Sequence, residues 1–239
     1  MSHICPVCGK KHLAAEICPY CGAMVPPKTS QAIIDPKNAS ALDNSKKLLF
    51  VDTETTGLPI NRHASIYFTS NWPRLVEIAW IECFENGSVV SEYNRIIKPD
   101  SYEIPLSASA IHGITTERAI QEGVPIESVL RGFHNSLINS SFIVGHNIDF
   151  DAKVILAEYI RAGLIQSHLQ FLMKKKICTM ISTKNFCRIR TGHGYYKYPK
   201  LSELHSKLFG KTLRGKHSAL QDARMCMKCY FELKRRDKI

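Results

Sequence analysis

Two acidic residues stand at the end of an apolar run near residue 50. The segment LLFVDTETTG, residues 48–57, begins as a buried strand and then places Asp52 and Glu54 one residue apart. Side chains at positions i and i+2 of a strand project from the same face, so these two carboxylates lie side by side. They repel each other unless a proton or a cation lies between them, and oxygen ligands of this kind suit Mg²⁺ or Mn²⁺. Taken alone, the pair also fits an exposed acidic strand end.

A second group of acids follows a short apolar segment in FIVGHNIDFD, residues 142–151. The pattern predicts a buried strand over the first four residues and then a helix, with Asn147 as its N-cap. Asp149 lies in the first turn, where a carboxylate commonly does no more than complement the helix dipole. Asp151 occupies the N4 position, which packs against the chain entering the helix. We therefore expect Asp151, and not Asp149, to face the sheet.

The third group is GKHSALQDA, residues 215–223, at the start of another predicted helix. Ser218 and Gln221 match the S-x-x-Q capping box, which makes His217 the N′ residue and Asp222 the N4 residue. These two positions are neighbours in the staple geometry, so a histidine and a carboxylate come together there. His217 can then act as a general base near whatever Asp222 binds. For this segment alone, a surface histidine with ordinary partners is the alternative.

Four cysteines near the N-terminus have the spacing of a metal site. Two Cys-x-x-Cys turns supply four thiolates in the tetrahedron that Zn²⁺ prefers, and so small a segment needs the metal for its folding energy. Two disulfides, a redox pair or a rubredoxin-like iron site are the alternatives. We expect one structural Zn²⁺ in a short zinc ribbon that binds a partner or steadies the chain. Its ligands are Cys5, Cys8, Cys18 and Cys21.

The elements that position the acids begin at Lys47. We divide the chain into a zinc-ribbon module at 1–26, a polar linker at 27–46 and an α/β domain at 47–239. Along this domain the first predicted elements are strands, and strands and helices are mixed after them. This order predicts a mixed β-sheet flanked by helices. An Asn-Gly turn joins two of the strands into a hairpin. Strands are expected over 47–53, 75–84, 89–98 and 142–145, and helices over 116–122, 126–139, 148–162, 201–208 and 219–234.

Charge is unevenly distributed along the 239 residues, whose net charge is +11. Residues 174–239 hold 18 Lys/Arg and 4 Asp/Glu, a balance of +14, so the remainder carries −3. A basic C-terminal quarter beside an acidic site suggests nucleic acid as partner, although charge alone fits a solvated basic face equally well. No apolar run approaches the roughly 18 residues of a membrane span, and the N-terminus has no apolar signal core. We expect a cytoplasmic protein with no membrane partner.

One basic segment, RIRTGHGYYKYPK at residues 188–200, interleaves cations with tyrosines. Stacking aromatic rings among phosphate-binding cations suit a single-stranded nucleic acid. The alternative is a surface loop whose tyrosines cover the helix predicted over 201–208.

Taken in this order, the three acidic segments make the chain resemble the DnaQ-like 3′→5′ exonuclease family of the DEDDh type. The family's motifs D-x-E-x-T-G, H-N-x-x-F-D and H-x-A-x-x-D-A are met at residues 52–57, 146–151 and 217–223. The resemblance covers roughly residues 47–235 and does not include the four cysteines. It implies a ribonuclease-H-like fold, which agrees with the mixed sheet predicted above.

The resemblance also implies an activity. It implies two Mg²⁺ or Mn²⁺ ions held by four acids, with His217 taking a proton from the attacking water, and nucleoside 5′-monophosphates released from DNA 3′ ends. The four acids are Asp52, Glu54, Asp151 and Asp222. The implied nucleotide-binding residues are Thr55, Thr56, Leu58, His112 and Asn147. Two alternatives stay open among these: Leu58 as a wedge or as loop packing, and His112 at the nucleotide or as a cap on the turn at Gly113.

Three other functions compete with a DNA exonuclease. An exoribonuclease of the same fold would carry the same motifs, since discrimination rests on contacts to a 2′-hydroxyl. A zinc-ribbon protein that binds nucleic acid with little catalysis is a second alternative, disfavoured by the intact acids and His217. In a third, the ribbon docks the nuclease onto a polymerase or another protein. The expected substrate is a single-stranded 3′ end, with DNA favoured over RNA.

Overall fold

The structure, a computed structural model, describes residues 2–4, 11–13, 46–192, 194–211 and 218–239. Near the N-terminus, β1 (Ser2–Ile4) and β2 (Lys11–Leu13) pair antiparallel. The main strands are β3 (Lys47–Thr55), β4 (Leu75–Phe84), β5 (Val89–Ile96), β6 (Phe142–Gly145) and β7 (Lys175–Cys178). The longer helices are α1 (Leu106–His112), α2 (Thr116–Glu122), α3 (Ile126–Ile138), α4 (Ile148–Arg161), α5 (Ile165–Met173), α8 (Leu201–Phe209) and α9 (Ala219–Arg235). Short turns of helix are η1 (Thr69–Asn71), α6 (Thr179–Ser182) and α7 (Lys184–Cys187).

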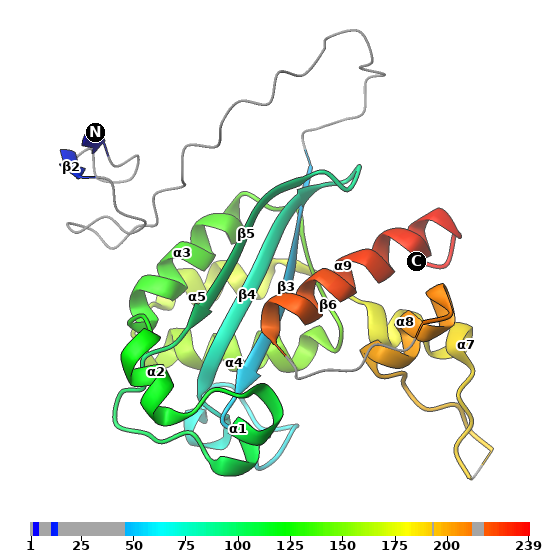
Figure 1. The fold of residues 1–239 in the computed structure, drawn as a ribbon, viewed down its shortest axis with the longest axis horizontal. Helices are drawn as coiled ribbons and strands as arrows, with labels where there is room; N and C mark the ends of the chain where they lie inside the picture. Colours follow the sequence, from blue (N-terminus) through cyan, green and yellow to red (C-terminus); the bar gives the residue numbers. More distant parts are fainter. Residues whose placement is uncertain (1, 5–10, 14–45, 193, 212–217) are drawn as a thin grey trace, which may run out of the picture.

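The five main strands form one mixed sheet in the order β5-β4-β3-β6-β7 (Figure 1). β4 and β5 are antiparallel, as the hairpin at Asn86-Gly87 requires, and β3 and β4 are also antiparallel, whereas β3–β6 and β6–β7 are parallel. A parallel pair needs a crossover, and α4 with α5 supplies the one between β6 and β7. The predicted mixed sheet with flanking helices is therefore confirmed, although neither β7 nor α5 was predicted.

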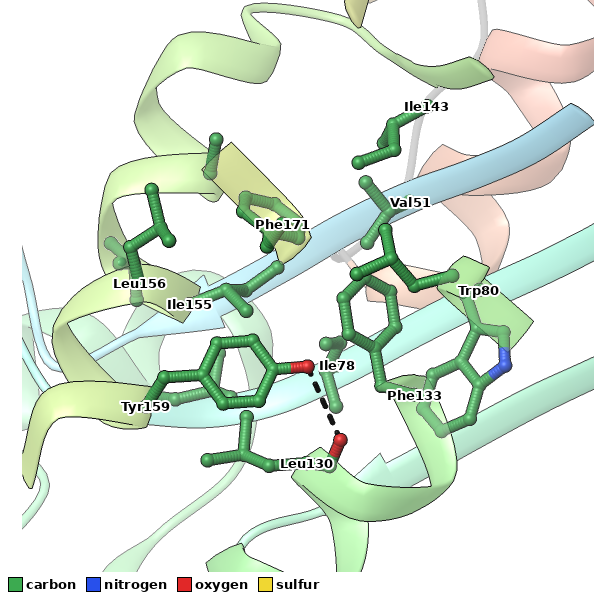
Figure 2. Packing of buried hydrophobic residues seen from close by; sticks show 14 of the residues in the cluster. Val51, Ile78, Trp80, Leu130, Phe133, Ile143, Ile155, Leu156, Tyr159 and Phe171 are labelled. Atoms are coloured by element: carbon green, nitrogen blue, oxygen red, sulfur yellow. Dashed lines mark hydrogen bonds between the residues drawn. The ribbon is translucent and has the colours of Figure 1, made fainter. Parts of the chain in front are cut away.

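Successive side chains along the strands point to opposite faces of the sheet, and each face is covered by its own layer of helices. Val51 and Trp80 point to one face, where they pack with Phe133 of α3, Tyr159 of α4 and Phe171 of α5. Figure 2 shows this cluster, with the Tyr159 hydroxyl donating to the Leu130 carbonyl at 3.3 Å. The aromatic rings fill the space between the sheet and the helices on this face.

The other face of the sheet is covered by α9, which crosses it obliquely in Figure 1. Phe50 and Ala79 pack there against the apolar stripe of α9, including Ala223 and Tyr230. Because residues at i+2 share a face, the carboxylates that follow Phe50 on β3 also point toward α9. None of the helices in the described ranges has the length and apolar character that a bilayer crossing requires.

Candidate metal centre

Three carboxylates from two elements meet at the C-terminal end of β3. One oxygen from each of Asp52, Glu54 and Asp222 lies within 4.8 Å of the others, and all three residues are half-buried. β3 runs two residues further than predicted, so Glu54 still follows the strand alternation, with a register shift between Glu54 and Thr55. Bulges of this kind re-aim side chains at functional sites. A group of hard oxygen donors at this spacing can hold a divalent cation.

Asp222 reaches the cluster because α9 is fixed by a carboxylate on the sheet. The predicted capping box of Ser218 and Gln221 is wrong: Ser218 is the N-cap, but its side chain makes no capping hydrogen bond. The Ala219 N–H instead donates to Glu77 Oε2 at 2.9 Å. Glu77 lies on β4 directly opposite Glu54, is buried, and also accepts from Asn94 Nδ2 at 3.0 Å. A buried anion at a helix N-terminus is favourable because it accepts a charge-assisted hydrogen bond and interacts with the helix dipole.

Asp151 joins the site from α4, on the other face of the sheet. It is 4% exposed, and its Oδ1 accepts from the Thr53 hydroxyl at 2.7 Å. Asp149 is exposed and forms an ion pair with Lys153 at 2.8 Å, so the structure separates the two acids as the helix geometry predicts. Asn147 is the N-cap position, but its side chain makes no capping bond because the residue is left-handed, with φ 71°. Asparagine tolerates that conformation better than most residues.

Electrostatic strain is concentrated on Asp52 and Asp151. Burial, followed by the charges of Asp151, Asp222, Glu54 and Glu77, raises the pKa of Asp52 well above its ordinary value of 3.8. Burial raises the pKa of Asp151 to about 7, although the Thr53 hydroxyl and nearby backbone N–H groups oppose the shift. Carboxylates so arranged are protonated or neutralised by a cation. The donor set therefore fits a divalent metal ion.

His146, in the turn before α4, is hydrogen-bonded to the segment before α8. Its Nε2 lies 2.9 Å from the Pro199 carbonyl, which can only accept, so Nε2 carries the proton. The Thr179 hydroxyl, 2.9 Å away, then donates to Nδ1. Burial lowers the pKa of His146, while the Pro199 carbonyl and Asp222 act in the opposite sense. A neutral, doubly hydrogen-bonded ring of this kind holds backbone in place.

The chain after Glu54 forms one wall of a cavity that is also lined by the first turn of α4, which carries Asp151, although none of the four acids lines it. Thr56 is held to the residue before β4 through its hydroxyl, which accepts from the Arg74 N–H at 2.9 Å. Gly57 follows with φ 150°, a conformation open mainly to glycine. Leu58 is 84% exposed, so it is not packed within its loop. It lines a cavity of about 390 Å³. The other lining residues are Pro59, Ile60, Arg62, His63, Trp72, Asn147, Asp149, Phe150 and Lys153.

A buried ion network clamps this wall to α4, and sequence reasoning missed it. Glu158 is 1% exposed and accepts from Arg74 Nε at 2.9 Å and Arg161 Nη1 at 2.8 Å. Arg161 also donates to the carbonyls of Thr69 and Trp72 at 2.6 and 2.7 Å. The loop between β3 and β4 is thus fixed against α4. In the sequence, the only sign of this network is that Glu158 and Arg161 are charged residues in a helix predicted to be amphipathic, and this does not reveal their partners.

The remaining nucleotide-binding candidates lie on the same side of the sheet end. Thr55 donates its hydroxyl to the Gly57 carbonyl at 2.7 Å. His112 is buried at the end of α1, and its Nδ1 accepts from the Ile114 N–H at 3.1 Å, so it does cap the turn at Gly113. Burial lowers the pKa of His112, while the Thr55 backbone and Glu77 oppose this, which places the ring beside the start of the loop.

Five predicted site residues lie outside the described residues. They are the histidine His217 and the cysteines Cys5, Cys8, Cys18 and Cys21.

The sequence and the fold were compared with those of known proteins. The model of the Exonuclease family matches residues 49–230, which include all four acids. The DNA polymerase III subunit epsilon of Buchnera aphidicola is 29% identical over 148 residues, which cover 62% of this chain and 54% of that protein. An uncharacterized exonuclease of Escherichia phage 186 is 29% identical over 197 residues, 80% of this chain and 92% of the phage protein.

Among solved structures, E. coli Exonuclease I in complex with a dT13 oligonucleotide superimposes with a TM-score of 0.64 at 19% identity. The match covers 80% of this chain and 42% of that one, and it establishes a shared fold. The chain thus spans about half or less of the length of the first epsilon subunit and of Exonuclease I.

Proposed function

Since this chain belongs to the exonuclease family, we propose that it is a metal-dependent 3′→5′ exonuclease that releases nucleoside 5′-monophosphates from DNA 3′ ends. The carboxylate cluster carries the proposal: Asp52, Glu54 and Asp222 bring oxygens within 4.8 Å, and Asp151 is close enough to raise the pKa of Asp52. The agreement of these positions with the DEDDh motifs supports the direction of digestion. In the reaction, a water oxygen attacks the terminal phosphorus and the bond to the 3′ oxygen of the shortened strand breaks.

The four acids are the residues that would hold two Mg²⁺ or Mn²⁺ ions. Such a pair stabilises both the attacking and the leaving oxygen of an in-line displacement. The protein's own part is to present the carboxylates from β3, α4 and α9 in a fixed arrangement. Thr53 orients Asp151, and Glu77 orients the helix that carries Asp222.

His217 is proposed as the group that takes the proton from the attacking water. It precedes α9 by two residues, and Glu77 holds the first N–H of that helix. This would bring the imidazole close to Asp222 if the N′ and N4 positions keep their usual proximity. His217 keeps the proton of the attacking water and later releases it to solvent, and solvent water supplies the proton that completes the 3′-hydroxyl of the shortened strand.

The cavity between the loop after Glu54 and the first turn of α4 is proposed to receive the 3′-terminal nucleotides. Leu58 and Phe150 offer apolar surface to a base, while Arg62 and Lys153 offer charge to phosphates. Thr55, Thr56, His112 and Asn147 are assigned to the same task. A DNA substrate is supported by relatives named as a DNA polymerase III subunit and by a fold neighbour solved with a dT13 oligonucleotide.

The substrate is tested with end-labelled single-stranded DNA and RNA of matched sequence, incubated with Mg²⁺. Wild type should shorten the DNA faster, and Asp222→Asn should shorten neither. Faster digestion of RNA would reassign the protein as an exoribonuclease. Strand binding without metal-dependent digestion would favour a non-catalytic binding protein.

Glu77 is expected to affect the Mg²⁺ concentration needed for activity, because it holds the start of α9, the helix that carries Asp222. Glu77→Ala leaves the buried Ala219 N–H without its acceptor, which should cost about 1–3 kcal/mol of unfolding free energy and raise the Mg²⁺ concentration for half-maximal activity. Glu77→Gln should largely rescue both. Its carbonyl can accept from Ala219, and its amide can donate to a turned-over Asn94, whose Oδ1 is buried without a hydrogen-bond partner among the described residues. Thermal melts and metal titrations of activity provide the measurement.

The control for Glu77 is a buried glutamate on the opposite face of the same strand. Glu82 accepts from the Ser136 hydroxyl and pairs with Lys47 at 3.6 Å, away from α9. Glu82→Ala should lower stability and leave the metal requirement unchanged. An equal metal requirement in Glu77→Ala and Glu82→Ala would show that Glu77 has no specific part in positioning the site.

The N-terminal cysteines are proposed to bind one Zn²⁺, and the module they form to contact a polymerase or another partner. The purified full chain should contain about one equivalent of zinc, measured by mass spectrometry of the metal, because four thiolates at this spacing form a closed site. Cys5→Ser and Cys18→Ser should each lose it, while Cys178→Ser in the nuclease domain should keep it. Iron in place of zinc, or full zinc in the serine variants, would contradict this assignment.

A further inference from the structure

The segment 188–200 forms a basic, aromatic hairpin that the proposed chemistry does not use. The Thr191 N–H donates to the Tyr195 carbonyl at 2.8 Å, and the Lys197 N–H donates to the Ile189 carbonyl at 2.9 Å. Between these bonds, Arg190 and Tyr196 form an antiparallel β-bridge. In Figure 1 the hairpin is the loop between α7 and α8 that projects from the domain. Two chain segments paired in this way present their side chains on a defined scaffold.

Of the two interpretations of this segment, the exposure of Tyr195 favours strand binding, whereas Tyr196 beside it is half-buried. The side chain of Tyr195 is 77% exposed, so it does not cover α8. Tyr198 is 49% exposed and has the Lys184 ammonium 4.9 Å from its ring centre. An exposed tyrosine on a hairpin adds nothing to the core, and its flat ring is available for stacking on a base.

The charged side chains of the hairpin and its flanking segments are almost entirely positive. Residues 174–211 contain ten Lys/Arg and one Asp/Glu, Glu203. Glu203 is engaged by Lys197, at 2.6 Å, and by the Lys200 N–H. Arg188 and Arg190 are exposed, and their charges are available to phosphates.

The base of the hairpin is attached to the candidate site. Pro199 is buried, and its carbonyl accepts from His146, the residue before Asn147 in the cavity wall. The hairpin base and the turn that leads to Asp151 are therefore one hydrogen bond apart. A strand whose 3′ end lies at the acids can continue from the cavity toward these rings and cations.

We propose that the hairpin 188–200 binds the single-stranded nucleic acid upstream of the 3′-terminal nucleotides. The proposal rests on the proposed exonuclease function for the direction of the strand. Arg188 and Arg190 contact phosphates, and Tyr195 stacks on a base. The hairpin contributes to holding long strands and takes no part in the chemistry at the terminal phosphodiester.

The test is direct binding of a fluorescent oligothymidylate of about 20 nucleotides, measured by anisotropy in EDTA so that digestion is absent. Tyr195→Ala should weaken binding about fivefold or more, while Tyr195→Phe, which keeps the ring, should bind like wild type. The double variant Arg188→Ala/Arg190→Ala should lower the slope of log Kd against log salt by about 1.4, since each phosphate contact on a single strand contributes about 0.7. Lys98→Ala/Arg131→Ala removes two exposed cations elsewhere and should leave that slope unchanged.

A second substrate separates this proposal from the proposed function. The p-nitrophenyl ester of thymidine 5′-monophosphate has no upstream nucleotide, so all these variants should hydrolyse it at the wild-type rate. Unchanged oligonucleotide binding in both Tyr195→Ala and the double arginine variant would overturn the hairpin proposal, as would equal losses on the ester. Hairpin-dependent binding by a protein that digests neither substrate would uphold strand binding by the hairpin and overturn the proposed exonuclease function.

Discussion

Replacing Asp52 by asparagine is expected to reduce nuclease activity by about 10³-fold or more. The side chain is the centre of the cluster, with Asp151, Asp222 and Glu54 all close enough to affect its pKa. An amide is a poor ligand for the proposed ions, whose stabilisation of the transition state is worth several kcal/mol. Initial rates on single-stranded DNA with saturating Mg²⁺ give the measurement.

Asp149→Asn is the matched control for this loss. Asp149 belongs to the same family motif region and lines the cavity, but it is exposed and paired with Lys153. Its replacement should change the rate less than about tenfold, since it does not contribute to the proposed metal centre. Similar losses in the two variants would mean that the charge of the cavity, and not metal binding, supports the reaction.

The same substitution at Asp52 should stabilise the protein when metal is removed. A raised pKa in the folded state means that folding favours the protonated acid, so stability falls as pH rises above the ordinary value of 3.8. In EDTA at about pH 8, Asp52→Asn should therefore melt above wild type, and the difference should shrink toward about pH 4. Mg²⁺ should raise the melting temperature of wild type and leave that of the variant nearly unchanged. A wild-type melting temperature that rises with pH while the variant's does not would contradict the strain assigned to this site.

Replacing His217 by alanine is expected to lower the rate by about 10²- to 10⁴-fold, the usual contribution of a positioned general base. The metal-induced rise in melting temperature should survive, because His217 is not one of the proposed ligands. The pH–rate profile should also lose its dependence on a group with a histidine-like pKa. Near-full activity in His217→Ala would show that another group accepts the proton.

Rules that concern a single helix or strand predicted the orientation of three of the four acids. The i, i+2 rule put Asp52 and Glu54 on one face, and the N4 rule chose Asp151 over Asp149, because both depend only on geometry within one element. The kinship with DnaQ-like exonucleases and the ribonuclease-H-like fold are confirmed by the match over residues 49–230 and by the fold comparison.

Long-range partners could not be predicted in the same way. Glu77 lies 142 residues from the Ala219 N–H that it binds, and no spacing rule connects a strand acid with a distant helix. The predicted capping box is absent, and the start of α9 is held instead by this distant carboxylate. The clamp of Arg161 on the loop carbonyls and the pairing of β7 likewise depend on tertiary packing.

The most direct test of the central claim is a time course with single-stranded DNA labelled at its 5′ end, incubated with Mg²⁺ and resolved at single-nucleotide steps. The proposed function predicts a ladder that shortens progressively from the 3′ end, with nucleoside 5′-monophosphates as the small products and no shortening in EDTA or by Asp52→Asn. Early release of the 5′ label as a mononucleotide, internal cuts, or digestion that persists in Asp52→Asn would contradict it.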